Sequence, residues 1–295
     1  MLKTSTRSNS IWGLLAGLSA AAIWGGMYVV SKLVMQVVQP FTLVVMRLAL
    51  GILTLTIVVL VRKSWKVTPR QFWAIFGVGL VGYGISLGFQ FVGTKLSTAA
   101  NGALVTSATP AFVLVFAAIF LAEKITRRRL LALGIASLGV VAVIDPRTTN
   151  LAPGFFLGNL CLVAAALTWA LYSVLIRKVT RTTDVLTTTL IAFIGGLPVC
   201  LPLSGWEIAS QGLPAISPAV LGGILFIGII STALAMVLWN TAFAVLDAGV
   251  ASLTFFAQPV VGTLLSVIFL KDHLTPLFIV GGVLIGISLL ISSNA

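Results

Sequence analysis

The feature that most constrains this fold is a series of long apolar runs along almost the whole chain. An α-helix rises about 1.5 Å per residue, so a run of about 17 to 27 residues can cross a hydrocarbon layer of roughly 30 Å. We distinguish ten runs, at approximately 11–31, 41–61, 71–93, 99–121, 129–145, 154–176, 185–203, 217–243, 248–270 and 276–294. The runs predict an all-α polytopic membrane protein with ten transmembrane helices.

Composition excludes a soluble domain. Apolar residues make up 59% of the 295 residues, charged residues make up 8%, and the mean hydropathy is +1.16. So little polar surface remains that the surrounding solvent must be lipid. The first apolar run is too long for a signal-peptide core, so we expect an uncleaved helix. Cys161 and Cys200 fall inside runs without metal-ligand spacing, and we expect no cofactor and no metal site.

Basic residues are concentrated in alternate connections between the runs. The 13 on one predicted side are Lys3, Arg7, Arg62, Lys63, Lys66, Arg70, Lys124, Arg127, Arg128, Arg129, Arg177, Lys178 and Arg181, out of 18 in all. Cytoplasmic connections of membrane proteins carry this excess. We therefore expect a multi-pass protein of the bacterial inner membrane with both termini cytoplasmic. Membrane orientation also explains the net charge of +12, so no nucleic-acid partner is expected.

Two stretches half a chain apart are alike. AAIWGGMYVVSK at 21–32 and ALTWALYSVLIRK at 166–178 each place a Trp inside an apolar helix, a Tyr within one turn of it, and a basic residue at the end. A shift of four more residues aligns the later parts of the two halves. It pairs Pro110 with Pro259, Phe120 with Phe269, Glu123 with Asp272 and Thr126 with Thr275. The chain is therefore predicted to consist of two five-helix repeats, residues 1–147 and 148–295.

An odd number of helices per repeat means that the second repeat starts from the opposite side of the membrane. The connections agree with this, because the one after the second run carries four basic residues and its counterpart at 204–218 carries none. Inverted repeats around a midplane site are typical of secondary transporters.

These residues resemble the drug/metabolite transporter superfamily with two EamA-type repeats. The resemblance rests on the early Trp of each repeat, on the proline in LVTSATPAF and LTFFAQPVV, and on the LAEKIT and LKDHLT segments that follow. Within the family, the chain is most similar to amino-acid exporters of the YddG type. The resemblance implies ten helices in two inverted halves around a central cavity, export as the direction of transport, and no nucleotide-hydrolysing domain.

Polar and aromatic side chains lie on single stripes of several runs. Lipid offers such side chains no partner, so they must face protein or a water-filled cavity. Spacings of three and four residues place Tyr83, Ser86, Gln90 and Thr94 on one helical face. The candidate substrate-binding residues are Trp24, Tyr28, Tyr83, Gln90, Asn101, Thr106, Trp169, Tyr172, Trp239, Asn240 and Gln258. Helix packing and location at the lipid interface remain alternative explanations for each of them.

Arg47 is the one charge well inside a run. Its guanidinium could hold a substrate carboxylate bidentately, or it could snorkel to the outer surface about two turns away, and the sequence leaves both open. Pro110 and Pro259 are candidate hinges, because proline removes a helical hydrogen bond. All six acidic residues fall at helix ends or in connections, so no midplane carboxylate is expected.

The sequence therefore predicts a monomeric secondary transporter that exports small amphipathic metabolites, above all aromatic and hydrophobic amino acids, by alternating access. Efflux of cationic compounds is the alternative, which cation–π contacts would support and the missing embedded acid weakens. An intramembrane enzyme would need a nucleophile with a base, paired aspartates or a metal site, and the single His273 supplies none of these. A receptor or a passive channel stays open as a third class.

Overall fold

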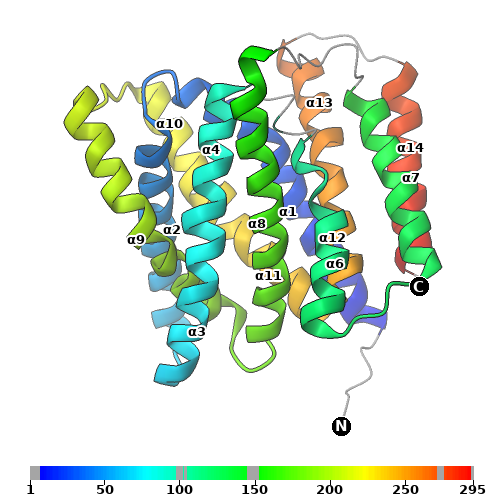
Figure 1. Ribbon diagram of the computed structural model, residues 1–295. Coiled ribbons are helices and arrows are strands. Elements are labelled where there is room, and N and C mark those ends of the chain that lie inside the picture. The colour runs from blue at the N-terminus through cyan, green and yellow to red at the C-terminus, as the bar shows by residue number, and fades with distance from the viewer. Residues whose placement is uncertain (1–6, 98–101, 103–104, 145–152, 271–275, 294–295) are drawn as a thin grey trace.

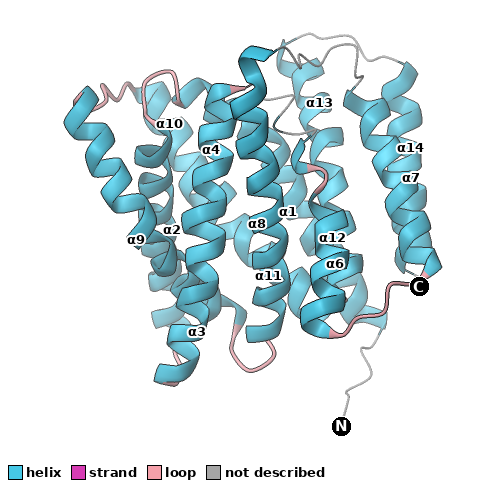
Figure 2. Ribbon diagram, viewed as in Figure 1, coloured by secondary structure: helices cyan, strands magenta, loops and turns pink. Residues whose placement is uncertain are grey.

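A computed structural model describes residues 7–97, 102, 105–144, 153–270 and 276–293, and these residues form helices and short connections without a strand (Figures 1 and 2). Asn101 and the predicted repeat boundary at 147 lie outside this part of the chain. The unbroken α-helices are α1 (Arg7–Val34), α2 (Pro40–Arg62), α6 (Thr109–Leu121), α7 (Arg127–Ile144), α8 (Phe156–Val179), α9 (Val185–Gln211) and α14 (Pro276–Ser293).

Three further rods change helical type along their length. In two of them a π-helical segment joins two α-helices: α3 (Pro69–Gly79), η1 (Leu80–Ser86) and α4 (Leu87–Leu96), and then α10 (Pro218–Leu225), η4 (Phe226–Leu234) and α11 (Ala235–Val245). In the third, a 3₁₀ turn joins the helices: α12 (Ala248–Leu253), η5 (Thr254–Phe256) and α13 (Ala257–Leu270). A short 3₁₀ turn, η3 (Pro153–Phe155), precedes α8. The apolar periodicity indicated the rods but not these changes of type.

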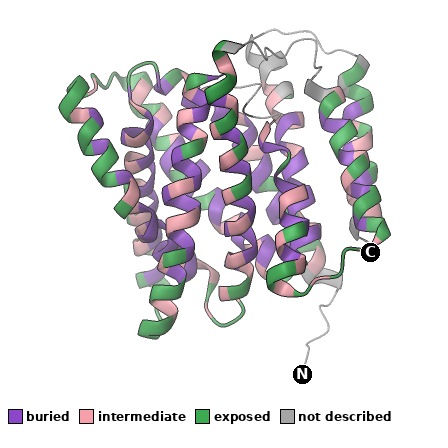
Figure 3. Ribbon diagram, viewed as in Figure 1, coloured by how far each residue is buried: buried purple, intermediate pink, exposed green. Residues whose placement is uncertain are grey.

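Six helical rods in the described part of the chain are long and apolar enough to cross a membrane: Ser10–Val34, Pro40–Arg62, Pro69–Leu96, Phe156–Val179, Val185–Gln211 and Pro218–Val245. Shorter apolar helices cover Thr109–Leu121, Ala248–Gly262 and Ile279–Ile291. Exposed residues lie on the outward surfaces of the rods (Figure 3). Many of them are large and apolar, as expected of helices that face lipid. The prediction of an all-α, multi-pass membrane protein is thus confirmed.

The end of α9 predicted from the sequence is eight residues too early. The apolar run was expected to end at 203, but the helix continues to Gln211 and ends where Gly212 adopts a φ of +82°. The additional turns carry Glu207, whose carboxylate accepts hydrogen bonds from the backbone N–H groups of Phe41 at 3.0 Å and Thr42 at 2.7 Å. A carboxylate at the start of α2 satisfies donors that the helix itself cannot, which explains an acidic residue in this part of α9.

Helix packing follows a matched pattern in the two halves of the chain. α1 packs along α11 and α13, whereas α8 packs along α4 and α6; α2 packs along α9, and α7 pairs with α14 at one edge of the bundle (Figure 1). The crossing of α3 with α9 is so close that glycine is required. A Cβ on Gly79 would lie 2.0 Å from the Ala192 carbonyl oxygen, and one on Gly195 would lie 2.2 Å from that of Phe76.

The bundle has two unlike ends. One end, the lower end in Figure 1, holds the starts of α1 and α3 and the α6–α7 and α8–α9 connections. We call this end the basic face, because it carries Arg62, Lys63, Lys66, Arg70, Lys124, Arg127, Arg128, Arg129, Arg177, Lys178 and Arg181. Among the described residues, the other end carries Lys32 and Lys95. The last turn of α14 also lies at the basic face (Figure 1).

Candidate substrate cavity

A small cavity with about 30 Å³ of free volume lies where the two halves of the chain meet. A free volume of this size holds about one or two water molecules, so a larger ligand binds only when the surrounding helices move apart. The lining residues come from both halves: Trp24, Met27, Arg47, Ser86, Leu87, Gln90, Thr106, Thr109, Ala165, Ala166, Trp169, Met236, Phe255 and Gln258. Six residues singled out from the sequence therefore share this cavity: Trp24, Arg47, Gln90, Thr106, Trp169 and Gln258.

Aromatic rings form one wall of the cavity. Trp24 and Trp169, the matched residues of the two repeated stretches, meet edge to face with 5.8 Å between ring centroids. Phe255 adds a third ring, 6.1 Å from Trp24. The rings of Trp24 and Trp169 are almost fully buried among helices, and each gives an apolar surface on which a ligand side chain can pack.

The π-helical segment η4 anchors two cavity residues. The indole N–H of Trp24 donates to the Ser231 carbonyl oxygen at 3.0 Å, and Nε of Arg47 donates to the Thr232 hydroxyl at 2.7 Å. Thr232 in turn donates to the Ile227 carbonyl, five residues earlier, at 2.7 Å. Short π-helical segments inside α-helices are frequent at functional sites, and here one fixes the orientation of a Trp and an Arg.

A second wall is polar and uncharged. The Tyr28 hydroxyl is 3.1 Å from the Thr106 hydroxyl and accepts from the Gln90 amide nitrogen at 2.8 Å. Thr106 also donates to the Gly102 carbonyl at 2.6 Å. Tyr28 thus positions Gln90 and Thr106, the two residues of this group that line the cavity.

Arg47 does not snorkel to a membrane surface. Its side chain is fully buried, it lines the cavity, and its guanidinium carbon lies 5.1 Å from the centre of the Phe91 ring. Nε is bonded to Thr232, but neither terminal nitrogen has a hydrogen-bond partner. A buried guanidinium with two free nitrogens is costly unless an anion pairs with it, because desolvating an unpaired charge costs several kcal/mol.

Two more donors at the cavity lack partners. The indole nitrogen of Trp169 and the amide nitrogen of Gln258 are buried and unbonded. With Arg47, they make a set of unsatisfied hydrogen-bond donors around one cavity that no described Asp or Glu lines. Buried polar groups in folded proteins nearly always have partners, so these donors are free to bond to a water molecule or to an acceptor on a ligand.

Four sequence-predicted residues lie deeper, outside the cavity lining. The Tyr83 hydroxyl is 2.5 Å from that of Tyr172, which donates to the Asn240 side-chain oxygen at 2.9 Å. The Asn240 amide nitrogen donates to Thr189 at 2.9 Å. Trp239 is also fully buried and donates to the Ser173 hydroxyl at 3.2 Å. These residues satisfy one another, so packing accounts for them without a substrate.

The two prolines lie in first turns of helices. Pro110 is the second residue of α6, which follows a turn at 107–108, and Pro259 is the third residue of α13, directly after the 3₁₀ segment η5. Proline at these positions costs little because the first-turn N–H groups have no helical partner. Each proline therefore marks a break between helical segments near the cavity.

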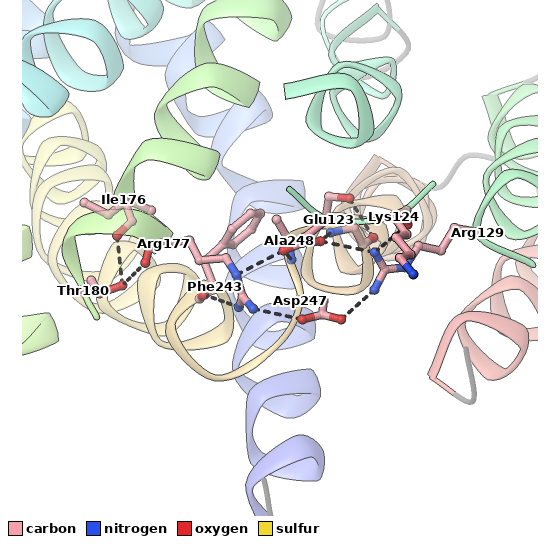
Figure 4. A network of polar contacts seen from close by, with 11 residues as sticks. Glu123, Lys124, Arg129, Ile176, Arg177, Thr180, Phe243, Asp247 and Ala248 are labelled. Carbon is pink, nitrogen blue, oxygen red and sulfur yellow. Dashed lines mark hydrogen bonds and ion pairs between the residues drawn. The ribbon is translucent and has the colours of Figure 1, made fainter. Parts of the chain in front are cut away.

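Below the cavity, charged residues join both halves at the basic face (Figure 4). Arg129 pairs with Glu123 at 3.2 Å and with Asp247 at 2.6 Å; Arg177 pairs with Glu123 at 3.2 Å and with Asp247 at 2.9 Å. Glu123 also accepts from the backbone N–H of Ala248 at 3.0 Å. We call Glu123, Arg129, Arg177 and Asp247 the ion-pair ring. It ties the ends of α6, α8 and α11 to the starts of α7 and α12.

The basic residue at the end of each repeated stretch has a shared structural role. At the end of α4, Lys32 donates to the carbonyl oxygens of Thr94 at 2.9 Å and Ser97 at 2.7 Å. Arg177 donates to the Phe243 carbonyl oxygen at 2.9 Å, near the end of α11. Each cation satisfies free carbonyl groups at a helix C-terminus, where positive charge is favoured.

The fold and the cavity define a class, the polytopic membrane transporters. The EamA-like transporter family model matches residues 11–144 and again 156–294, so the chain belongs to this family of the drug/metabolite transporter superfamily. It is a transporter and not an enzyme.

Individual relatives are distant but cover nearly the whole chain. An uncharacterized transporter of Archaeoglobus fulgidus is 28% identical over 285 residues, 95% of this chain and 98% of that protein. The aromatic amino acid exporter YddG of Ancylobacter novellus is 25% identical over 263 residues, 86% of this chain and 87% of that protein. A solved crystal structure, 21% identical, matches with a TM-score of 0.77 over 95% of both chains, which supports the fold.

Proposed function

We propose that this protein exports small amphipathic metabolites, chiefly aromatic and hydrophobic amino acids, across the bacterial inner membrane by alternating access. The observation that carries the proposal is the cavity itself, in which Trp24 and Trp169 face the same space as the unpaired guanidinium of Arg47. The rings suit an apolar side chain, and the guanidinium suits a carboxylate. The similarity to an aromatic amino acid exporter supports the same substrate class.

The proposed architecture is ten spans in two inverted repeats, residues 1–147 and 148–295. Three observations support it. The packing of α1 with α11 and α13 is matched by that of α8 with α4 and α6, and π-helical segments occur in the corresponding third rod of each half. The capping roles of Lys32 and Arg177 correspond in the same way, at opposite ends of the bundle.

Alternating access requires that one side of the cavity be closed while the other is open. The ion-pair ring and the buried aromatic residues Tyr83, Tyr172 and Trp239 close the side toward the basic face. We propose that this conformation is closed toward the basic face and that the basic face lies in the cytoplasm.

The charge of the cavity argues against the alternative function, efflux of cationic compounds. A cation would enter a cavity that already holds an unpaired Arg47, with no described carboxylate in the lining. Like charges in a buried site repel strongly.

Topology gives a first prediction. Reporter fusions at the C-terminus and in the α6–α7 connection at 122–126 are expected to be cytoplasmic, because the basic face carries the positive excess. A fusion in the α9–α10 connection at 213–217 is the control and should be periplasmic. A periplasmic signal from either of the first two positions would overturn the inverted-repeat architecture.

The second prediction concerns the coupling of transport to a proton gradient. Counterflow of substrate should persist when the pH is equal on both sides, since the described acids Glu123, Asp184, Glu207 and Asp247 lie at helix ends or near them and none lines the cavity. The measurement is counterflow in proteoliposomes with and without a protonophore. Loss of counterflow whenever the proton gradient collapses would reveal a proton site in the transport path and refute the prediction.

The experiment that tests the proposed function is uptake of labelled L-phenylalanine or L-tryptophan into proteoliposomes preloaded with the unlabelled amino acid. Saturable uptake that depends on the preload is expected. Uptake equal to that of protein-free liposomes, for all hydrophobic amino acids, would reject amino acids as the substrate class.

A further inference from the structure

Charge in the cavity is unbalanced, and the imbalance bears on which amphipathic molecules fit. Arg47 and Trp169 line the cavity, their side-chain nitrogens can only donate hydrogen bonds, and the two terminal nitrogens of Arg47 and the indole nitrogen of Trp169 are buried without a partner. Gln258 adds an unbonded amide nitrogen. A ligand carboxylate, which is acceptor-only, would satisfy this set.

Among the residues that the structure describes, no carboxylate lines the cavity to pair with an ammonium group. The hydroxyl groups that line the cavity already use their protons within the protein: Ser86 donates to the Ala165 carbonyl at 2.9 Å and Thr109 to the Thr106 carbonyl at 2.6 Å. Their lone pairs and the amide oxygens are neutral acceptors. When an amino acid zwitterion is bound, the cavity therefore keeps the net positive charge of Arg47. A bound monoanion neutralises that charge.

We propose that this cavity recognises monoanionic carboxylates that carry an apolar or aromatic side chain, and that it requires the carboxylate but not the ammonium group. Deaminated acids derived from amino acids then bind at least as tightly as the amino acids themselves. The inference rests on the proposed function for the location of the site and deepens its substrate class. It predicts a ligand order that size and hydrophobicity alone do not predict.

Four ligands with one phenyl group test the order: 3-phenylpropanoate, L-phenylalanine, phenethylamine and the neutral 3-phenylpropanamide. Binding to the purified full-length protein is measured by calorimetry and by ligand-induced thermal shift. Charge-assisted hydrogen bonds contribute about 1.5 to 3 kcal/mol, or roughly a tenfold to hundredfold change in Kd. We expect 3-phenylpropanoate to bind at least about tenfold more tightly than the amide and phenethylamine, and no more weakly than phenylalanine.

Variants of Arg47 assign the effect to its guanidinium. Arg47→Gln should weaken 3-phenylpropanoate binding by about tenfold or more and leave the amide unchanged, while Arg47→Lys keeps the charge and loses less. The control is Arg62→Gln, the same substitution at an exposed position of the same helix. Because Arg47→Gln removes an unpaired buried charge, its Tm without ligand should not fall below that of the wild type, which shows that lost binding is not lost folding.

The outcomes separate this inference from the proposed function. Tighter binding of 3-phenylpropanoate that is lost in Arg47→Gln supports the inference, and if phenylalanine does not bind at all, only the assignment of amino acids fails. Binding of phenylalanine at least tenfold tighter than that of 3-phenylpropanoate overturns the inference and leaves amino-acid export standing. Equal binding of 3-phenylpropanoate by the wild type and by Arg47→Gln also overturns the inference. If none of the four ligands binds, both the inference and the proposed function are overturned.

Discussion

Replacing Trp24 or Trp169 with alanine is expected to lower substrate counterflow by at least about tenfold. Both rings line the cavity, and each contributes the apolar surface on which a substrate side chain packs. Counterflow with purified variants in proteoliposomes is the measurement. The control is Trp12→Ala, a change on the same helix as Trp24 at a side chain that is 69% exposed and makes no described ring contact.

Stability must be measured with the same variants. Trp24 also packs against Trp239, with 5.2 Å between ring centroids, and truncating a packed Trp typically costs about 3 to 5 kcal/mol. Trp169→Phe helps to separate the two effects, because it keeps a six-membered aromatic ring and removes the five-membered ring with its unpartnered indole N–H. Transport at the wild-type rate in both alanine variants, or losses of transport that match losses of folded protein, would return these residues to a packing role.

Substituting Glu123 with glutamine is expected to open the basic face. Glu123 pairs with both Arg129 and Arg177, whose side chains are only 7% and 14% exposed. Removing one partner of a buried ion pair typically costs about 3 to 5 kcal/mol, so the closed arrangement should lose most of its advantage over an inward-facing one. A thiol in the cavity should then react with a membrane-impermeant maleimide from the basic face at least about tenfold faster.

The reporter thiol is Ser86→Cys in a background with Cys161→Ala and Cys200→Ala, since Ser86 lines the cavity and the native cysteines are free. Glu207→Gln is the matched control, because that carboxylate caps α2 and takes no part in the ion-pair ring. An unchanged labelling rate in Glu123→Gln, in protein that still folds, would mean that the ion-pair ring does not hold this side closed.

Periodicity and duplication in the sequence were enough to predict the helical membrane fold and six of the 14 residues that line the cavity. Trp24, Trp169, Gln90, Thr106 and Gln258 were selected because they lie on polar or aromatic stripes, and the structure brings all five to one cavity. A stripe defines the face of a helix but not the depth of each residue along it. This is why Tyr83, Tyr172 and Asn240, on equally good stripes, lie beyond the cavity and bond to one another.

The features that sequence reasoning missed depend on contacts between the halves. Glu123 and Asp247 are 124 positions apart, and each resembled an ordinary residue at a helix end until the fold placed both beside Arg177. Arg177 itself was explained by membrane orientation, although its place at the end of a duplicated stretch was a usable signal. The π-helical segments had no signal in the apolar pattern, because adding a residue to a turn shifts the stripe without shortening the run.

The central claim is that one cavity between the two halves is the transport site and is reached from one side at a time. Accessibility of the thiol in Ser86→Cys, measured with wild-type Glu123, tests this most directly. In oriented vesicles, the impermeant maleimide is applied either to the basic face or to the opposite face, with and without saturating substrate.

We expect labelling from the face opposite the basic face, little labelling from the basic face, and protection by substrate. Such a pattern requires a cavity that binds the substrate and is closed on one side. Equal labelling from both faces without protection by substrate would indicate an open channel or an unrelated crevice, and it would contradict the account.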